Sequence, residues 1–261
     1  MLHRLVELLP FIGFFIVTFL LVAAAEEVGY RWASRRKAKE DTEKEPPVGA
    51  MVGATLALLA FLLTFNFGIA ADAYHARRIS LSDEVNSIRL SYMLCDAIPE
   101  ATRTHCPEVR DALRAYVDQR LRWANGQPDP KGATANELIA RLSKAAMAVG
   151  VENPGSVDVF LGYVTRVIAL NEERTDVQER SRIANGFWVI LFVVALLAFT
   201  AVGYHGAVAG TSRSPVMLGV ALAFSAVVMV IGDLDRPGEG FIDVSQQPMI
   251  DLRDALAKSQ P

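Results

Sequence analysis

The chain contains 261 residues, of which 52% are hydrophobic and 21% charged, whereas soluble globular domains usually carry about 25% charged residues. Its formal net charge of -3 argues against nucleic acid as a partner, because binding to phosphates needs a basic surface. The apolar residues gather in four long segments, which predicts an integral membrane protein surrounded by the lipid bilayer.

The first uncharged segment covers residues 8–25. A bilayer core about 30 Å thick needs roughly 20 apolar residues in a helix, so one span fits here. The small residues 23–25 would also suit the cleavage site of a signal peptide. The basic residues that follow are typical of a stop-transfer flank and favour a retained span: Arg31, Arg35, Arg36, Lys37 and Lys39.

A linker rich in basic and acidic residues follows this span. Residues 1–47 are therefore expected to comprise the first transmembrane helix and this linker. Residues 26–47 include six basic and six acidic side chains and end in Pro46 and Pro47. We expect frayed helix here, followed by a break at the two prolines, because proline disrupts a continuing helix.

The second span is predicted over residues 48–71. Gly49, Gly53 and Ala57 recur at four-residue intervals, and such small-residue faces let two helices approach closely. This face therefore indicates helix packing, either within one subunit or between subunits.

The same span carries an apolar stripe of Phe61, Phe65 and Ile69, which lie one helical turn apart. Such a stripe forms an ordinary packed core in most helices, but rings of apolar side chains also form dewetting constrictions in channels. Asn66 is strongly polar and lies well inside the span, so we expect it to face protein or a cavity rather than lipid, and it is a further pore-lining candidate.

Residues 72–182 are predicted to form a polar all-α domain with no strands. Its first helix continues from the second span with apolar residues spaced four and three apart, and Pro99 ends it. Further helices are expected from Pro107 to Asn125, from Thr134 with the capping-box partner Glu137, and after Ser156.

Cys95 and Cys106 flank the turn between the first two helices of this domain. Their separation suits a disulfide if the domain faces an oxidising compartment. His105 stands beside Cys106, but the surrounding histidines and cysteines are too sparse for a zinc site, so no metal is predicted.

The third and fourth spans are predicted over residues 183–212 and 213–232, and residues 233–261 form a C-terminal segment and tail. Two carboxylates at the end of the fourth span oppose the helix dipole, which predicts compensating partners. The candidates form either a structural ion-pair cluster or an ion-attracting vestibule or metal-binding mouth: Asp72, Arg77, Arg78, Asp233, Asp235 and Arg236.

The sequence contains no nucleophile elbow, phosphate loop, dinucleotide fingerprint or paired-histidine metalloprotease motif. We therefore expect neither enzymatic activity nor a cofactor. The predicted fold class is all-α, with four transmembrane helices and a helical polar domain between the second and the third.

The segments LLAFLLTFNFGIAADAYHARR, DEVNSI, RLSYM and DLDRPGEGFIDVSQQP resemble the bestrophin-like family of bacterial membrane proteins over roughly residues 48–256. The Asp-Arg-Pro element with Gly240 is the most specific part of the resemblance. Bestrophins are pentameric ion channels with four membrane helices and a helical polar domain in each subunit. Their second membrane helix lines the pore with apolar neck residues, and the matching candidates here are Phe61, Phe65 and Ile69.

This resemblance implies a homo-oligomeric, pentameric ion channel in the bacterial inner membrane that passes inorganic ions. The acidic calcium clasp of animal bestrophins has no counterpart here, so the resemblance gives no support for calcium gating. The alternative is a non-conducting membrane scaffold or sensor whose helical domain binds a partner.

The orientation in the membrane is left open by the charges. The basic linker at residues 26–47 favours a cytoplasmic linker and an outside polar domain. The flanking residues Arg77, Arg78, Arg180 and Arg182 favour the bestrophin orientation, which is the reverse. The pair Cys95 and Cys106 favours an outside polar domain.

Overall fold

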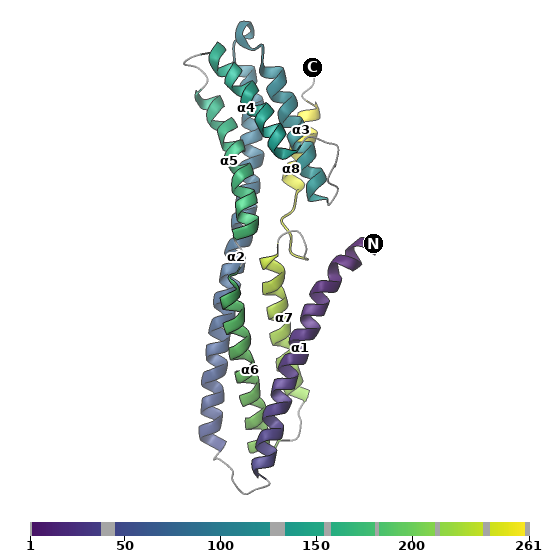
Figure 1. Cartoon of the computed structure of the whole chain (residues 1–261), viewed down its shortest axis with the longest axis vertical. Coiled ribbons are helices and arrows are strands. Elements are labelled where there is room, and N and C mark those ends of the chain that lie inside the picture. The colour runs from purple at the N-terminus through teal and green to yellow at the C-terminus, as the bar shows by residue number, and fades with distance from the viewer. Residues whose placement is uncertain are drawn as a thin grey trace. The chain divides into compact units, whose positions relative to one another are not determined.

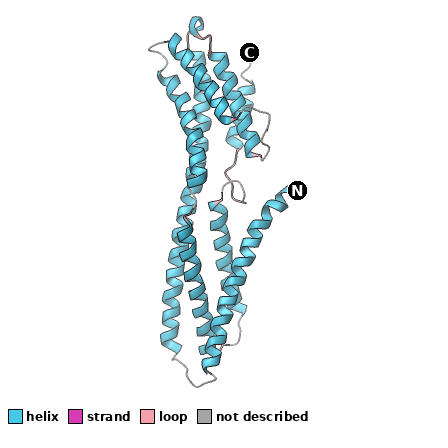
Figure 2. Ribbon diagram, viewed as in Figure 1, coloured by secondary structure: helices cyan, strands magenta, loops and turns pink. Residues whose placement is uncertain are grey.

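The described part of the chain consists of helices joined by turns and loops (Figures 1 and 2). A computed structural model describes residues 2–37, 45–125, 134–153, 158–180, 183–211, 215–236 and 241–258. Within these ranges there is no strand, which agrees with the predicted all-α class.

The chain folds into two compact units. The first, the apolar unit, comprises Met1–Tyr74 and Ser181–Asp243, and the second, the polar unit, comprises His75–Arg180 and Val244–Pro261. The apolar unit holds α1 (Leu2–Lys37), α6 (Asn185–Val208), α7 (Pro215–Asp235) and the first part of α2 (Glu45–Ala97). The polar unit holds the rest of α2 with η1 (Glu100–Thr102), α3 (Cys106–Ala124), α4 (Ala135–Glu152), α5 (Asp158–Arg180) and α8 (Gln247–Lys258).

Four helices are long and apolar enough to cross a membrane, as the sequence predicts. They are Ile12–Lys37, Pro47–Ala97, Asn185–Val208 and Val216–Asp235. Large apolar side chains of these helices remain exposed on the single chain, among them Val17, Met51, Leu197 and Val216. An exposed apolar surface of this kind suits contact with lipid or with further subunits.

The expected break at Pro46 and Pro47 is wrong. Helix α2 begins at Glu45, so both prolines lie in its first turn. Proline is favoured there because the first backbone N–H groups of a helix have no acceptor within the helix. The prolines therefore start α2, and α1 continues through the basic run to Lys37.

A backbone crossing between α1 and α6 positions the helices of the apolar unit. A Cβ atom placed on Gly29 would lie 1.9 Å from the carbonyl oxygen of Thr200, and one on Gly203 would lie 1.9 Å from that of Glu26. Only glycine fits at either position, because backbone atoms cannot move aside as a side chain can. Sequence analysis did not single out this pair, since the two glycines lie on different helices.

We expect Gly29→Ala and Gly203→Ala each to lower the melting temperature of the purified protein, because each methyl group forces α1 and α6 apart. The loss should reach about 2 kcal/mol or more per substitution. Gly13→Ala is the matched control on α1, since a Cβ atom there meets nothing within 4 Å. A Gly29→Ala protein as stable as the control would show that the crossing is not close.

The predicted small-residue face of α2 divides between two environments. A Cβ atom on Gly49 would meet the ring of His205 in α6 at 3.1 Å, so this glycine serves packing within the chain. Gly53 has nothing within 4 Å, and Ala57 is exposed. Their part of the face has no partner within the described chain.

The polar unit has a core built from the predicted stripes. Leu81, Val85, Ile88, Tyr92 and Cys95 of α2 are all buried in one cluster with residues of α3, α4 and α5. This confirms the four-three spacing of the stripe.

The helix boundaries in the polar unit also agree with most of the predicted signals. The capping box of Thr134 and Glu137 is present at the start of α4, and Asn125 caps α3. The predicted cap at Ser156 lies outside the described residues. The C-terminal α8 contributes Met249, Leu252 and Leu256 to the same core, a contact that sequence analysis did not predict.

Cys95 and Cys106 lie side by side in this core as free, buried thiols. The Sγ atom of Cys106 donates to the carbonyl oxygen of Cys95 at 3.8 Å. Sequence analysis thus placed the two residues together correctly, while the disulfide itself stays a prediction that depends on the compartment.

Candidate functional site

The phenylalanine pair of α2 projects away from the chain's own core. Phe61 is 65% exposed and Phe65 is 47% exposed, and the ring of Phe65 lies 5.7 Å from that of Phe187 in α6. Ile69 is half buried and packs against a cluster formed by Ala70, Ile183, Ile231 and Leu234. The predicted stripe therefore becomes progressively more buried from Phe61 to Ile69.

Asn66 faces the interior of the apolar unit, as expected for a polar group in a span. It is 1% exposed, and its Nδ2 atom donates to the carbonyl oxygen of Leu62 at 2.8 Å. Its Oδ1 atom is buried without a hydrogen-bond partner within the described part of the chain. The structure thus separates Asn66 from the exposed face that carries Phe61 and Phe65.

Asp233 and Asp235 are buried and bind backbone groups. The N–H groups of Phe241 and Ile242 donate to the two carboxylate oxygens of Asp233 at 2.9 and 2.8 Å. The N–H group of Ile183 donates to Oδ1 of Asp235 at 2.6 Å. The compensation that the helix dipole requires therefore comes from backbone N–H groups.

Asp72 and Arg236, the other members of the predicted charged cluster in the apolar unit, do not join these carboxylates within its described residues. Arg236 is exposed, and neither Asp233 nor Asp235 forms an ion pair with it. Asp72 is exposed on α2. Arg77 and Arg78 belong to the polar unit, where Arg77 is half buried and Arg78 is exposed.

The two aspartates differ in how many acceptors they use, which gives a matched test. Asp233→Asn retains one acceptor oxygen for two N–H groups, whereas Asp235→Asn retains the single acceptor that Ile183 needs. We expect Asp233→Asn to destabilise the protein by about 1 to 3 kcal/mol and Asp235→Asn by less. Thermal unfolding of both variants checks this order, and equal losses would contradict the assigned bonding.

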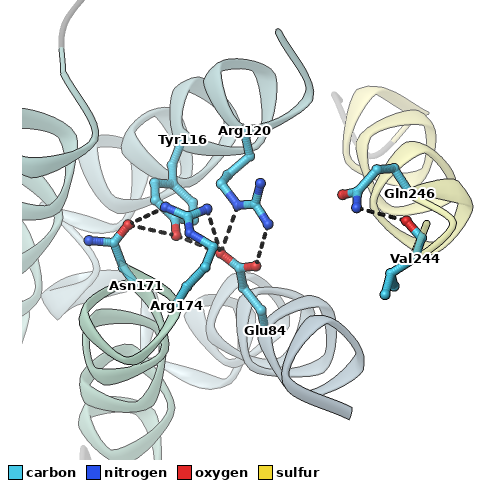
Figure 3. A network of polar contacts seen from close by, with 7 residues as sticks. All are labelled: Glu84, Tyr116, Arg120, Asn171, Arg174, Val244 and Gln246. Carbon is cyan, nitrogen blue, oxygen red and sulfur yellow. Dashed lines mark hydrogen bonds and ion pairs between the residues drawn. The ribbon is translucent and has the colours of Figure 1, made fainter. Parts of the chain in front are cut away.

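The polar unit contains a buried polar network that sequence analysis missed (Figure 3). The carboxylate of Glu84 in α2 accepts from Nε and Nη2 of Arg120 in α3 at 3.3 and 3.2 Å. The hydroxyl of Tyr116 donates to Oε1 of Glu84 at 2.5 Å and lies 3.3 Å from Oδ1 of Asn171 in α5. Arg174 of α5 donates to that same Oδ1 atom at 2.8 Å.

The buried position of this network makes its charges strongly interdependent. Burial, and then the nearby carboxylate of Glu84, raise the pKa of Tyr116, so this residue stays a neutral hydrogen-bond donor. Burial, and then repulsion from Arg120, lower the pKa of Arg174. The network ties α2, α3 and α5 together, and loss of either Glu84 or Arg120 would leave a buried charge without its partner.

A sequence signal for this network exists. Glu84 lies one turn before Ile88 on the buried stripe of α2, and Arg120 lies one turn after Tyr116 on the buried stripe of α3. A charged residue on the apolar face of each of two helices predicts a buried ion pair. What the spacing alone does not show is that the two faces meet.

No group in the described residues suggests a metal centre, since no three histidine, cysteine or acidic side chains gather closely enough to hold an ion. Several of the scattered carboxylates in the described residues form ion pairs, such as the pairs of Arg166 with Asp83 and of Arg110 with Asp96.

Comparisons with known proteins agree with this architecture. Crystal structures of a bacterial bestrophin homologue from Klebsiella pneumoniae, each with one aspartate replaced by alanine, align with TM-scores of 0.55 at 14% sequence identity. These alignments cover 94% and 95% of this chain and 97% of the solved chains. A membrane protein with one proline replaced by alanine aligns at 13% identity with a TM-score of 0.54, over 95% of this chain and 97% of the other.

The structural likeness establishes a shared fold, and the sequence comparison establishes the family. A search of curated protein sequences gives no significant match. The Bestrophin-like domain, however, matches residues 14–249, which is most of the chain. With four apolar helices and this fold, the chain is a membrane protein that belongs to the bestrophin-like family.

Proposed function

We propose that the protein is a homo-oligomeric ion channel of the bacterial inner membrane, in which α2 of each subunit lines the path of inorganic ions. In this arrangement the helical polar domain of residues 72–182 comes between the second and third spans in the order of the chain, in a four-span subunit. The membership of the bestrophin-like family supports this function, and we take the pentamer of bestrophins as the expected assembly.

The exposure of Phe61 and Phe65 carries the proposal. Both side chains lie on α2 and leave the core of the apolar unit, whereas Asn66 on the next face is buried in it. Four helices of one chain do not enclose a path for ions, so conduction requires copies of the chain around a symmetry axis. Rings of Phe61 and Phe65 around such an axis would form an apolar constriction that gates by excluding water.

Asp72 is the best candidate for attracting ions near this constriction. It lies seven residues after Phe65, which places it on the same helix face, and it is exposed. Asp233 and Asp235 are poorly suited to that role, because both are buried and backbone N–H groups bind both oxygens of Asp233 and one oxygen of Asp235. We therefore assign these two aspartates a structural role at the end of α7.

We expect the double substitution of Phe61→Ala and Phe65→Ala to raise single-channel conductance at least about twofold in planar bilayers, because smaller side chains let water fill the constriction. Phe67→Ala is the matched control, since Phe67 is also exposed but points to roughly the opposite side of α2. Equal effects of both changes would contradict the assignment of the lining face. If the wild-type protein is monomeric in nanodiscs and gives no current in planar bilayers, the channel proposal is refuted.

A non-conducting scaffold or sensor is the second candidate, and one observation favours it. Met147 and Val151 of α4 and Val159 of α5 are strongly exposed in the polar unit, with Val151 at 82%. Met147 and Val151 lie one turn apart on the same face of α4, and exposed apolar side chains on a shared face suit a protein interaction site. The bilayer recordings separate the two candidates, because a scaffold gives no current in any variant.

We propose that the polar unit lies outside the cytoplasm. A cysteine introduced at Val151 in a chain lacking Cys95 and Cys106 should then react with an impermeant thiol reagent in intact cells. In the wild-type protein, oxidation should join the two native cysteines and lower the intact mass by two hydrogens. Labelling of Val151→Cys only after lysis would reverse the orientation, and the two thiols would then be expected to stay reduced.

A further inference from the structure

The buried network of the polar unit carries more positive than negative charge. Arg120 and Arg174 both approach Glu84, which is the single carboxylate of the network, while Tyr116 and Asn171 are neutral (Figure 3). Glu84 and Arg120 have side chains 4% and 8% exposed, so water screens their pair weakly. Among the described residues, one positive charge in this buried group therefore has no negative partner of its own.

That surplus charge belongs to Arg174. Arg120 forms two hydrogen bonds with Glu84, whereas Nη1 of Arg174 lies 4.0 Å from Oε1 of Glu84, beyond hydrogen-bond distance. Within the described residues, this Nη1 atom is buried without an acceptor. A guanidinium group normally fills its donors with oxygen atoms, and an unfilled buried donor is costly.

Arg174 also lies at the edge of the network that solvent can reach. Its side chain keeps 18% of its surface exposed, and its guanidinium group stands 5.7 Å from the ring centre of Trp123, which is exposed. The lowered pKa of Arg174 agrees with a charge that is both buried and repelled by Arg120. A negatively charged ligand at this edge would supply the missing acceptor and neutralise the surplus charge.

We propose that Arg174 and Trp123 form a binding site for a small oxyanion of the phosphate type at the surface of the polar unit. The planar guanidinium group suits oxyanions because two of its N–H groups donate to two oxygens of one ligand. Because Nη1 is buried in the free protein, binding at this site requires Arg174 to turn about its terminal bonds so that Nη1 meets the ligand. The site is independent of the channel proposal and holds for a scaffold equally well.

The test is a titration of the full-length protein in nanodiscs with inorganic phosphate, against chloride at equal ionic strength. The fluorescence of Trp123 should change along a saturable curve, because the ligand alters the charge above its ring. The melting temperature should rise with phosphate, because a ligand that binds only the folded state stabilises it.

Three variants assign the response to the site. Arg174→Gln should bind phosphate about tenfold or more weakly and lose both signals. Trp123→Phe should lose the fluorescence change and keep most of the rise in melting temperature. Arg166→Gln is the matched control on α5, where Arg166 is exposed and paired with Asp83, and it should respond as the wild type does.

Phosphate-free buffer tests the surplus charge separately. There, Arg174→Gln should unfold at or above the temperature of the wild type, since it removes a buried charge without a partner. A marked fall in the melting temperature of Arg174→Gln would contradict the surplus positive charge. Arg174→Lys would then replace Arg174→Gln in the phosphate titration, where we expect it to bind phosphate more weakly than the wild type does. The site is refuted if the wild type gives no saturable response, or if Arg174→Gln and the wild type respond alike.

Discussion

The backbone contact between α1 and α6 is the constraint on which the apolar unit depends. Gly29 and Gly203 bring the two helices so close that no side chain fits between them, and α7 also packs on α1. Without a hydrophobic driving force between helices in lipid, such close packing is a main source of stability. With α1, α6 and α7 packed in this way, the face of α2 that carries Phe61 and Phe65 remains uncovered.

The polar unit is held by a different kind of interaction. Its apolar core joins α2, α3, α4, α5 and α8. The hydrogen-bond network around Glu84 links three of these helices, α2, α3 and α5. An apolar core tolerates small shifts between helices, whereas a buried charge pair with several hydrogen bonds fixes one arrangement. Arg174 approaches this pair as a second guanidinium, and its buried Nη1 atom has no acceptor among the described residues.

The buried carboxylates show how the fold assigns different roles to one residue type. Glu84 is neutralised by arginine, whereas Asp233 and Asp235 bind backbone N–H groups near the end of α7. Asp72 is exposed on α2 and remains available to solutes. These differences follow from the surroundings of each carboxylate, because burial requires that every charged oxygen finds a donor.

The sequence by itself determined the helical class, the four apolar spans, the core stripe of α2 and the capping box of α4, because each depends on residues close together in the chain. Only the tertiary structure paired Gly29 with α6, Glu84 with Arg120, and Asp233 with the N–H groups of residues 241 and 242. The expected break at Pro46 failed because two prolines can equally well begin a helix. Spacing along one helix shows which residues share a face, but which faces meet depends on how all the helices pack together.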